Sequence, residues 1–175
     1  MIEKVLKSEV SKKILISTGF VVLALLLPQM FHLFGGTGQI FLPMHIPVIL
    51  TGITLGPVFG LVTGIVSPVI STTLTGMPIV FPVMPIMICQ LGMLGFVSGI
   101  LNKYTKINSI LLILLTQISG FIGYAFGYQI IQMFFLNEIQ SNLSVLNAYI
   151  IGLPGVLMQL VLVTLIIEMS KRKAK

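Results

Sequence analysis

The chain has 175 residues, of which 56% are hydrophobic and 8% are charged, and its mean hydropathy is +1.11. Soluble domains carry about 25% charged residues, and a water-soluble fold of this length has too little interior to bury so much apolar surface. The composition therefore favours lipid as the solvent. The net charge of +6 does not indicate nucleic-acid binding, because the basic residues lie only at the termini and in one short loop.

Long stretches of the chain carry no Asp, Glu, Lys or Arg: from Lys13 to Lys103, from Lys106 to Glu138, and from Glu138 to Glu168. A charge at the centre of a membrane helix costs roughly 2.5–3.5 kcal/mol, so these stretches predict membrane-embedded segments. We expect an all-α integral membrane protein, a compact bundle of six transmembrane helices that forms one domain over residues 1–175. In chain order, the expected helices cover about 13–34, 44–55, 57–74, 83–101, 107–135 and 146–169. The second is short, and we expect Pro47 to break it.

The basic residues indicate the orientation of this bundle. All ten precede the first expected helix, lie between the fourth and fifth, or end the chain. Six spans place these three groups on one side, which the positive-inside rule assigns to the cytoplasm. We therefore expect a multi-pass protein of the cell membrane with both termini cytoplasmic.

Polar side chains gather near the expected outer ends of the helices, whereas the inner half is poorer in them. Polar groups in lipid need partners, so this gathering predicts a pocket open to the exterior; the alternative is that they lie at the headgroup level. The outer loops at 35–43 and 75–82 are uncharged and partly apolar, as expected of loops that cover a site. The second, fourth and sixth helices begin on the outer side, where free N–H groups and the helix dipole favour a neutral or singly anionic ligand.

Several chemistries are missing from the sequence. The only cysteine, Cys89, lies in an apolar run, and two histidines without a nearby carboxylate make a poor metal site. No carboxylate lies deep in the membrane to couple transport to ions, and no Gly-rich Walker loop is present. We expect no catalytic residue, no metal and no cofactor. The chain looks able to bind a ligand but not to power its transport.

The sequence resembles one family of membrane proteins. The resemblance rests on the run Gln39-Ile40-Phe41-Leu42-Pro43-Met44-His45-Ile46-Pro47-Val48, on Leu55-Gly56-Pro57-Val58-Phe59-Gly60-Leu61, on Ser67-Pro68 and on Thr75-Gly76-Met77-Pro78. These motifs are similar to those of the S components of energy-coupling factor (ECF) vitamin transporters. The resemblance implies a subunit that captures a vitamin or related micronutrient outside the cell. It also implies as partners a transmembrane T component and two cytoplasmic ATPases, which drive uptake.

Within that family, the motif from Leu42 to Pro47 looks most like pantothenate-type S components, and niacin and cobalamin-precursor types remain open. One departure concerns the first helix, which lacks the Ala-x-x-x-Ala pattern that many S components use to dock on the T component. Three other functions stay open on the residues alone: a stand-alone channel or facilitator, a membrane scaffold, and an intramembrane enzyme. The candidate substrate-binding residues are Gln39, Met44, His45, Met77, Gln90, Tyr124, Tyr128, Asn147 and Gln159.

Overall fold

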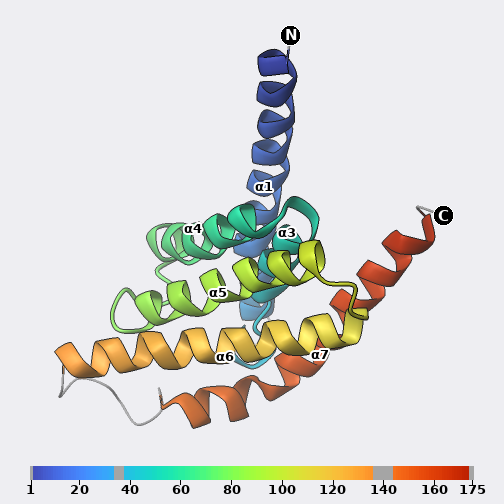
Figure 1. The fold of residues 1–175 in the computed structure, drawn as a ribbon. Coiled ribbons are helices and arrows are strands. Elements are labelled where there is room, and N and C mark those ends of the chain that lie inside the picture. The colour runs from blue at the N-terminus through green and yellow to red at the C-terminus, as the bar shows by residue number, and fades with distance from the viewer. Residues whose placement is uncertain (1, 34–37, 136–143, 174–175) are drawn as a thin grey trace.

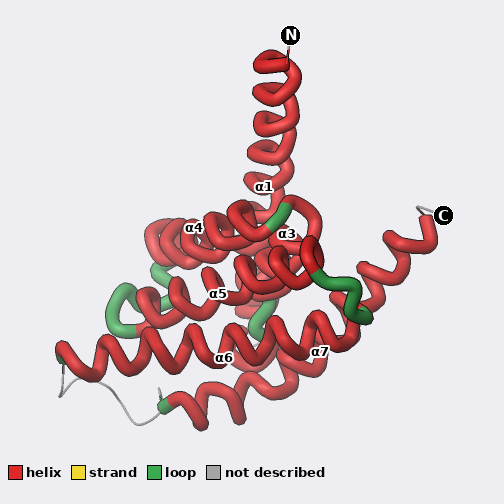
Figure 2. The backbone as a smooth tube through the Cα atoms, viewed as in Figure 1, coloured by secondary structure: helices red, strands yellow, loops and turns green. Residues whose placement is uncertain are grey.

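The computed structural model describes residues 2–33, 38–135 and 144–173, and throughout these ranges the chain is helical apart from short connections (Figures 1 and 2). The helices are α1 (Ile2–Leu33), α2 (Gly38–Phe41), α3 (His45–Leu55), α4 (Pro57–Thr75), α5 (Val83–Tyr104), α6 (Ser109–Phe134) and α7 (Val145–Lys173). The described residues contain no strand. This confirms the expectation of an all-helical protein.

Five of these helices are long and apolar enough to cross a membrane: α1, α4, α5, α6 and α7. The remaining expected span, the second in chain order, is α3, which has 11 residues. At 1.5 Å per residue it reaches only about half of a bilayer core roughly 30 Å thick. Its residues are mostly buried in the bundle instead. The prediction that Pro47 breaks this helix is wrong, because α3 continues through it. It is the third residue of α3, where the N–H that proline lacks would have no partner inside the helix.

The first and last helices extend past the expected apolar limits. α1 begins at Ile2 rather than near residue 13, and its N-terminal half projects beyond the other helices (Figure 1). α7 continues to Lys173. Charged residues interrupt the apolar pattern there without breaking the helix, and Glu9 and Lys12 form an exposed ion pair of 3.0 Å one turn apart.

The centre of the bundle is the contact between α4 and α5, where glycines bring the two backbones together. A Cβ atom on Gly60 would lie 2.2 Å from the carbonyl oxygen of Gly95, and a Cβ atom on Gly95 would lie 2.1 Å from that of Gly60. Small residues allow such close approach in lipid, where packing replaces the hydrophobic effect. Gly56, in the turn between α3 and α4 with φ at +100°, borders the same contact, because its backbone carbonyl carbon would lie 2.8 Å from a Cβ atom on Gly99.

The remaining helices pack around this pair. α6 covers the other side of α5, α3 packs against both α4 and α5, and α1 lies against α3 and α4. α7 contacts α6 and the short helix α2. The buried apolar core is formed by Ala24, Met44, Val48, Ile49, Leu91, Leu94, Leu112, Ile113, Val163 and Ile167. The connection between α4 and α5 and the C-terminal end of α6 lie together at one end of the bundle, away from the connection between α5 and α6 (Figure 1).

Candidate functional site

A cavity of about 300 Å³ opens at the end of the bundle where α1 and α4 finish and where α3, α5 and α7 begin. Its size is at the lower limit of small-molecule pockets, roughly 300–1,000 Å³. No residue that lines it carries a charge. Five lining side chains offer polar groups, and they come from five helices: Gln29, His45, Ser71, Gln90 and Tyr124.

The structure brings five of the nine predicted site residues to this cavity: Met44, His45, Met77, Gln90 and Tyr124. They come from four separate parts of the chain: the start of α3, the connection between α4 and α5, helix α5 and helix α6. The predicted gathering of polar groups at one end of the helices therefore corresponds to an actual hollow.

The other predicted residues lie elsewhere. Tyr128 is half-buried one turn beyond Tyr124 and packs against the cluster around Ile86. Asn147 is exposed in the first turn of α7. Gln159 is fully buried, but it bonds to protein atoms and does not line the cavity. The side chain of Gln39 lies outside the part of the chain that the structure describes.

Most of the lining that the sequence did not single out is apolar: Pro28, Leu42, Pro43, Pro78, Ile79, Val83, Met87, Ala148 and Ile151. Such residues carry no signal that separates them from the rest of an apolar chain. One sequence feature did point to part of this apolar lining: the loop at 75–82 is uncharged and partly apolar, and we expected such a loop to cover a site. Met77, Pro78 and Ile79 of this loop do line the cavity.

His45 is the side chain in the cavity wall whose bonding is least complete. It is 1% exposed, and neither Nδ1 nor Nε2 has a hydrogen-bond partner among the described residues. An imidazole offers one donor and one acceptor when neutral, and leaving such groups buried without partners costs about 1–3 kcal/mol. His45 is therefore a buried polar residue of the cavity wall whose hydrogen-bonding capacity is not used within the described structure.

The turn before α3 places His45 in this position. Leu42 has φ at +48°, in the left-handed region that residues other than glycine rarely adopt. Its carbonyl oxygen accepts the backbone N–H of His45 at 3.1 Å, which starts the helix. A conformation of this kind costs of order 1–3 kcal/mol and persists only where surrounding contacts fix it. Strain of this kind is often found at binding sites.

Hydroxyl groups at the end of α4 hold the opposite wall. Ser71 Oγ donates to the carbonyl oxygen of Met77 at 2.6 Å, and Thr72 Oγ1 donates to that of Pro78 at 2.8 Å. Thr75 Oγ1 adds a contact of 3.3 Å to the Met77 carbonyl. The loop after α4 is therefore folded back onto its own helix, and its apolar side chains form part of the cavity.

The helix N-termini at the cavity offer fewer free N–H groups than the sequence suggested. His45 and Met84 already donate their N–H groups to Leu42 and Ile79, at 3.1 Å each. Proline occupies the third position of both helices, as Pro47 in α3 and Pro85 in α5. The helix dipoles still favour negative charge, and in these two helices Ile46 and Val83 keep a first-turn N–H for which the turns supply no acceptor.

A smaller cavity of about 50 Å³ adjoins the main one and shares four of its lining residues, Leu42, Gln90, Tyr124 and Ala148. It extends the hollow towards Tyr149 and Gly152 on α7. No group of three or more His, Cys, Asp or Glu residues that could hold a metal occurs within the described ranges. What the arrangement can do is enclose a small uncharged or weakly charged molecule and form a few directed hydrogen bonds with it.

Comparison with known proteins supports this interpretation. A family model described as "ECF transporter, substrate-specific component" matches residues 12–169. The search of curated proteins and the search of solved structures each found no match. The family match covers almost the whole chain and confirms the resemblance that the sequence motifs suggested, as well as a multi-pass membrane protein. The chain belongs to the family of substrate-specific components of ECF transporters.

Proposed function

We propose that this chain captures a vitamin-type small molecule, with pantothenate favoured, from outside the cell and presents it for ATP-driven uptake. The observation that carries the proposal is the pairing of an uncharged cavity with His45, a buried side chain whose two ring nitrogens have no partner among the described residues. Membership of the ECF family gives the coarser role of a substrate-specific subunit, and the cavity supports the finer one.

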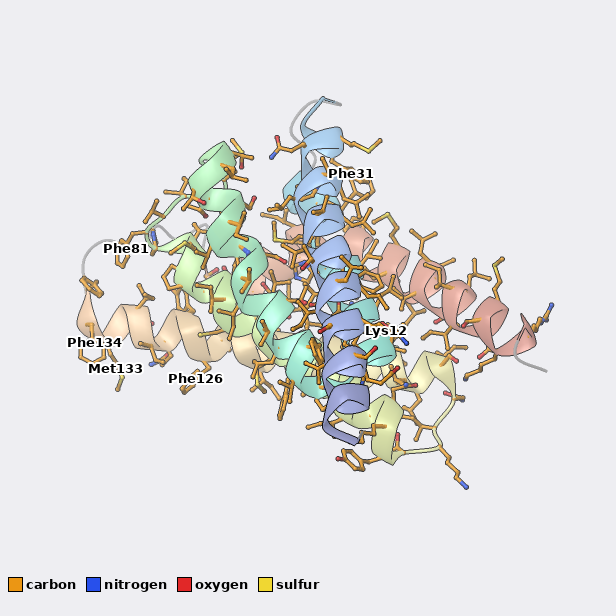
Figure 3. The ribbon with its side chains drawn as sticks, turned by 90° about the horizontal axis from the view of Figure 1, so that it is seen from above. Lys12, Phe31, Phe81, Phe126, Met133 and Phe134 are labelled. Atoms are coloured by element: carbon orange, nitrogen blue, oxygen red, sulfur yellow. The ribbon has the colours of Figure 1, made fainter. Side chains whose placement is uncertain are left out.

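The orientation follows from the charges. The basic residues whose side chains are described are Lys12, Lys13, Lys103, Lys106, Lys171 and Arg172, and all are exposed. They lie on the early part of α1, at the end of α5, before α6 and at the end of α7, opposite to the helix ends that form the cavity. In Figure 3, Phe81 and Phe134 lie at the end of the molecule away from Lys12. The positive-inside rule then supports cytoplasmic termini and an outward-facing cavity.

Pantothenate matches the chemistry of the cavity in three respects. Its hydroxyl and amide groups suit Ser71, Gln90 and His45, its methyl groups suit the apolar lining, and its single carboxylate suits the dipoles of α3 and α5. Nicotinate, which has an aromatic ring and one carboxylate, is the next candidate, and small cobalamin precursors follow. A complete corrinoid ring is too large for a cavity of about 300 Å³.

The partners in this proposal are a transmembrane T component and two cytoplasmic ATPases. The chain carries no Walker motif, so the energy for release has to come from other subunits. The experiment that tests the proposal is reconstitution in liposomes with and without these subunits. Pantothenate uptake that requires the T component, the ATPases and ATP is the expected result. Uptake by this chain alone without ATP would identify a channel or facilitator instead.

A further inference from the structure

We propose that Gln159, buried in α7 outside the cavity, is a positioning residue that fixes His45 for the ligand through the Leu42 turn. The inference deepens the proposed function, because it concerns the same site. It replaces the expectation that Gln159 itself touches the substrate.

The connection begins at the Gln159 amide. Its Nε2 donates to the carbonyl oxygen of Leu42 at 3.4 Å, across 117 residues of sequence. The same carbonyl oxygen accepts the backbone N–H of His45 at 3.1 Å. One atom therefore joins α7 to the first residue of α3, and that residue, His45, lines the cavity.

The other end of the Gln159 amide is fixed as well. Its Oε1 accepts a hydrogen bond of 2.6 Å from Gln117 Nε2 on α6. Gln159 is 0% exposed and Gln117 is 8% exposed. With its oxygen bonded in this way, the amide has its NH₂ group available to point at the turn. The two glutamines form a buried chain from the middle of α6 to the edge of the site.

The backbone of α7 is shaped to receive this turn. A Cβ atom on Gly152 would lie 2.9 Å from Leu42 Cδ1, and one on Gly155 would lie 2.6 Å from the carbonyl carbon of Phe41. α2 and Leu42 therefore rest directly on α7, one to two turns before Gln159. Because the φ of Leu42 is unfavourable for a residue with a side chain, the turn depends on contacts of this kind to keep its shape.

A purely structural role for the two glutamines makes different predictions. Hydrogen bonds between membrane helices commonly hold the helices together, and in that case the loss of Gln159 would loosen α6 against α7 without a specific effect at residues 42–45. A positioning role predicts that the loss of Gln159 loosens this turn in particular. It also predicts that the effect of this loss on ligand binding disappears when His45 is absent.

The first test needs no ligand. Hydrogen–deuterium exchange is measured on the purified full-length protein in detergent for the wild type, Gln159→Met, Gln117→Met and Thr164→Val. Thr164 is the matched control, because it lies on α7 with a buried hydroxyl that has no partner in the described structure. The amides of residues 42–46 are expected to exchange about tenfold faster in Gln159→Met, less so in Gln117→Met, and unchanged in Thr164→Val. Unchanged exchange at this turn in both glutamine variants would overturn the inference.

The second test is a double-mutant cycle with pantothenate as the probe. Gln159→Met is expected to weaken pantothenate binding about tenfold, and the same change in a His45→Leu background is expected to have less than about a threefold effect. Equal effects in both backgrounds would show that Gln159 does not act through His45. If the wild type binds no pantothenate, the proposed ligand is wrong, and the exchange experiment still decides the role of Gln159. If Gln159→Met does not fold, Gln117→Met takes its place in both tests.

Discussion

Ser71 Oγ on α4 donates a hydrogen bond of 2.6 Å to the carbonyl oxygen of Met77, six residues further along the chain. Thr72 makes the equivalent bond to Pro78 at 2.8 Å. These two bonds hold the loop that forms one wall of the cavity, whereas the turn at Leu42 and His45 forms the facing wall. The shape of the cavity therefore depends on backbone carbonyls held by side chains at two separate places.

Removal of both loop contacts, in the double variant Ser71→Ala with Thr72→Val, is expected to speed ligand dissociation. Each hydrogen bond contributes about 1 kcal/mol, so the loss of two predicts a decrease in affinity of roughly thirtyfold. The measurement is the dissociation rate of radiolabelled pantothenate from the purified protein. Thr73→Val is the control, because its exposed hydroxyl bonds only to Ile70 within the helix, at 2.9 Å. An equal loss of affinity in the Thr73→Val control would contradict a role for this loop in ligand binding.

His45→Leu is expected to make the ligand-free protein more stable but to weaken its binding of the ligand. The substitution keeps a side chain of similar size but removes two buried nitrogens that lack partners among the described residues, a gain of about 1–2 kcal/mol. At the same time, the affinity for pantothenate should fall by at least about tenfold. Thermal unfolding and calorimetry measure the two effects.

The matched control for His45 is Ser67→Ala. Ser67 Oγ is also buried without a partner in the described structure, but Ser67 does not line the cavity. Its loss should leave the affinity unchanged. A His45→Leu protein that binds as tightly as the wild type would contradict the role given to this histidine.

Gly60→Ala is expected to destabilise the bundle at its centre. The added Cβ atom would lie 2.2 Å from the carbonyl oxygen of Gly95, so α4 and α5 have to separate, at a cost of about 1–3 kcal/mol or more. The measurement is the thermal unfolding midpoint in detergent. Gly19→Ala on α1 is the matched control, because no atom lies within 4 Å of its added Cβ. Equal stability of the two variants would contradict the close packing of α4 on α5.

The proposed orientation of the bundle predicts which side of the membrane each loop faces. In a Cys89→Ser background, Val80→Cys should react with a membrane-impermeant maleimide in intact cells, because Val80 is 62% exposed in the loop at the cavity end. Tyr104→Cys, at a position 68% exposed beside Lys103, should react only after the membrane is opened. The reverse labelling pattern would place the basic end outside.

The sequence was most informative about elements that depend on composition alone. The charge-free stretches predicted the apolar parts of the helices because a charge in lipid is costly. Their ends were harder to place, because the charged first turns of α1 and the last turns of α7 continue as helix. The start expected at about residue 44 lies one residue before the observed start of α3 at His45, so the first-turn position of Pro47, where proline is tolerated, already followed from the expected boundary.

The candidate site was predictable in part. His45, Gln90 and Tyr124 were notable because polar groups are rare in this chain, Met44 and Met77 belong to the motifs that were singled out, and all five line the cavity. Met87 and Ala148 line it too, but nothing distinguishes them in the sequence from other apolar residues. Gln159 was predicted as a substrate-binding residue but does not line the cavity, and its partners on α6 and at Leu42 become visible only in the folded chain.

Whether this chain is a vitamin-binding subunit is decided by mass spectrometry of the small molecules that remain bound to the purified full-length protein, followed by calorimetry with the compound identified. The chain contains no tryptophan, so calorimetry takes the place of fluorescence quenching. The account predicts one bound molecule per chain, of the size and weak charge of pantothenate, with binding that is impaired by His45→Leu. A protein that carries no such molecule and binds none of the B vitamins would contradict it.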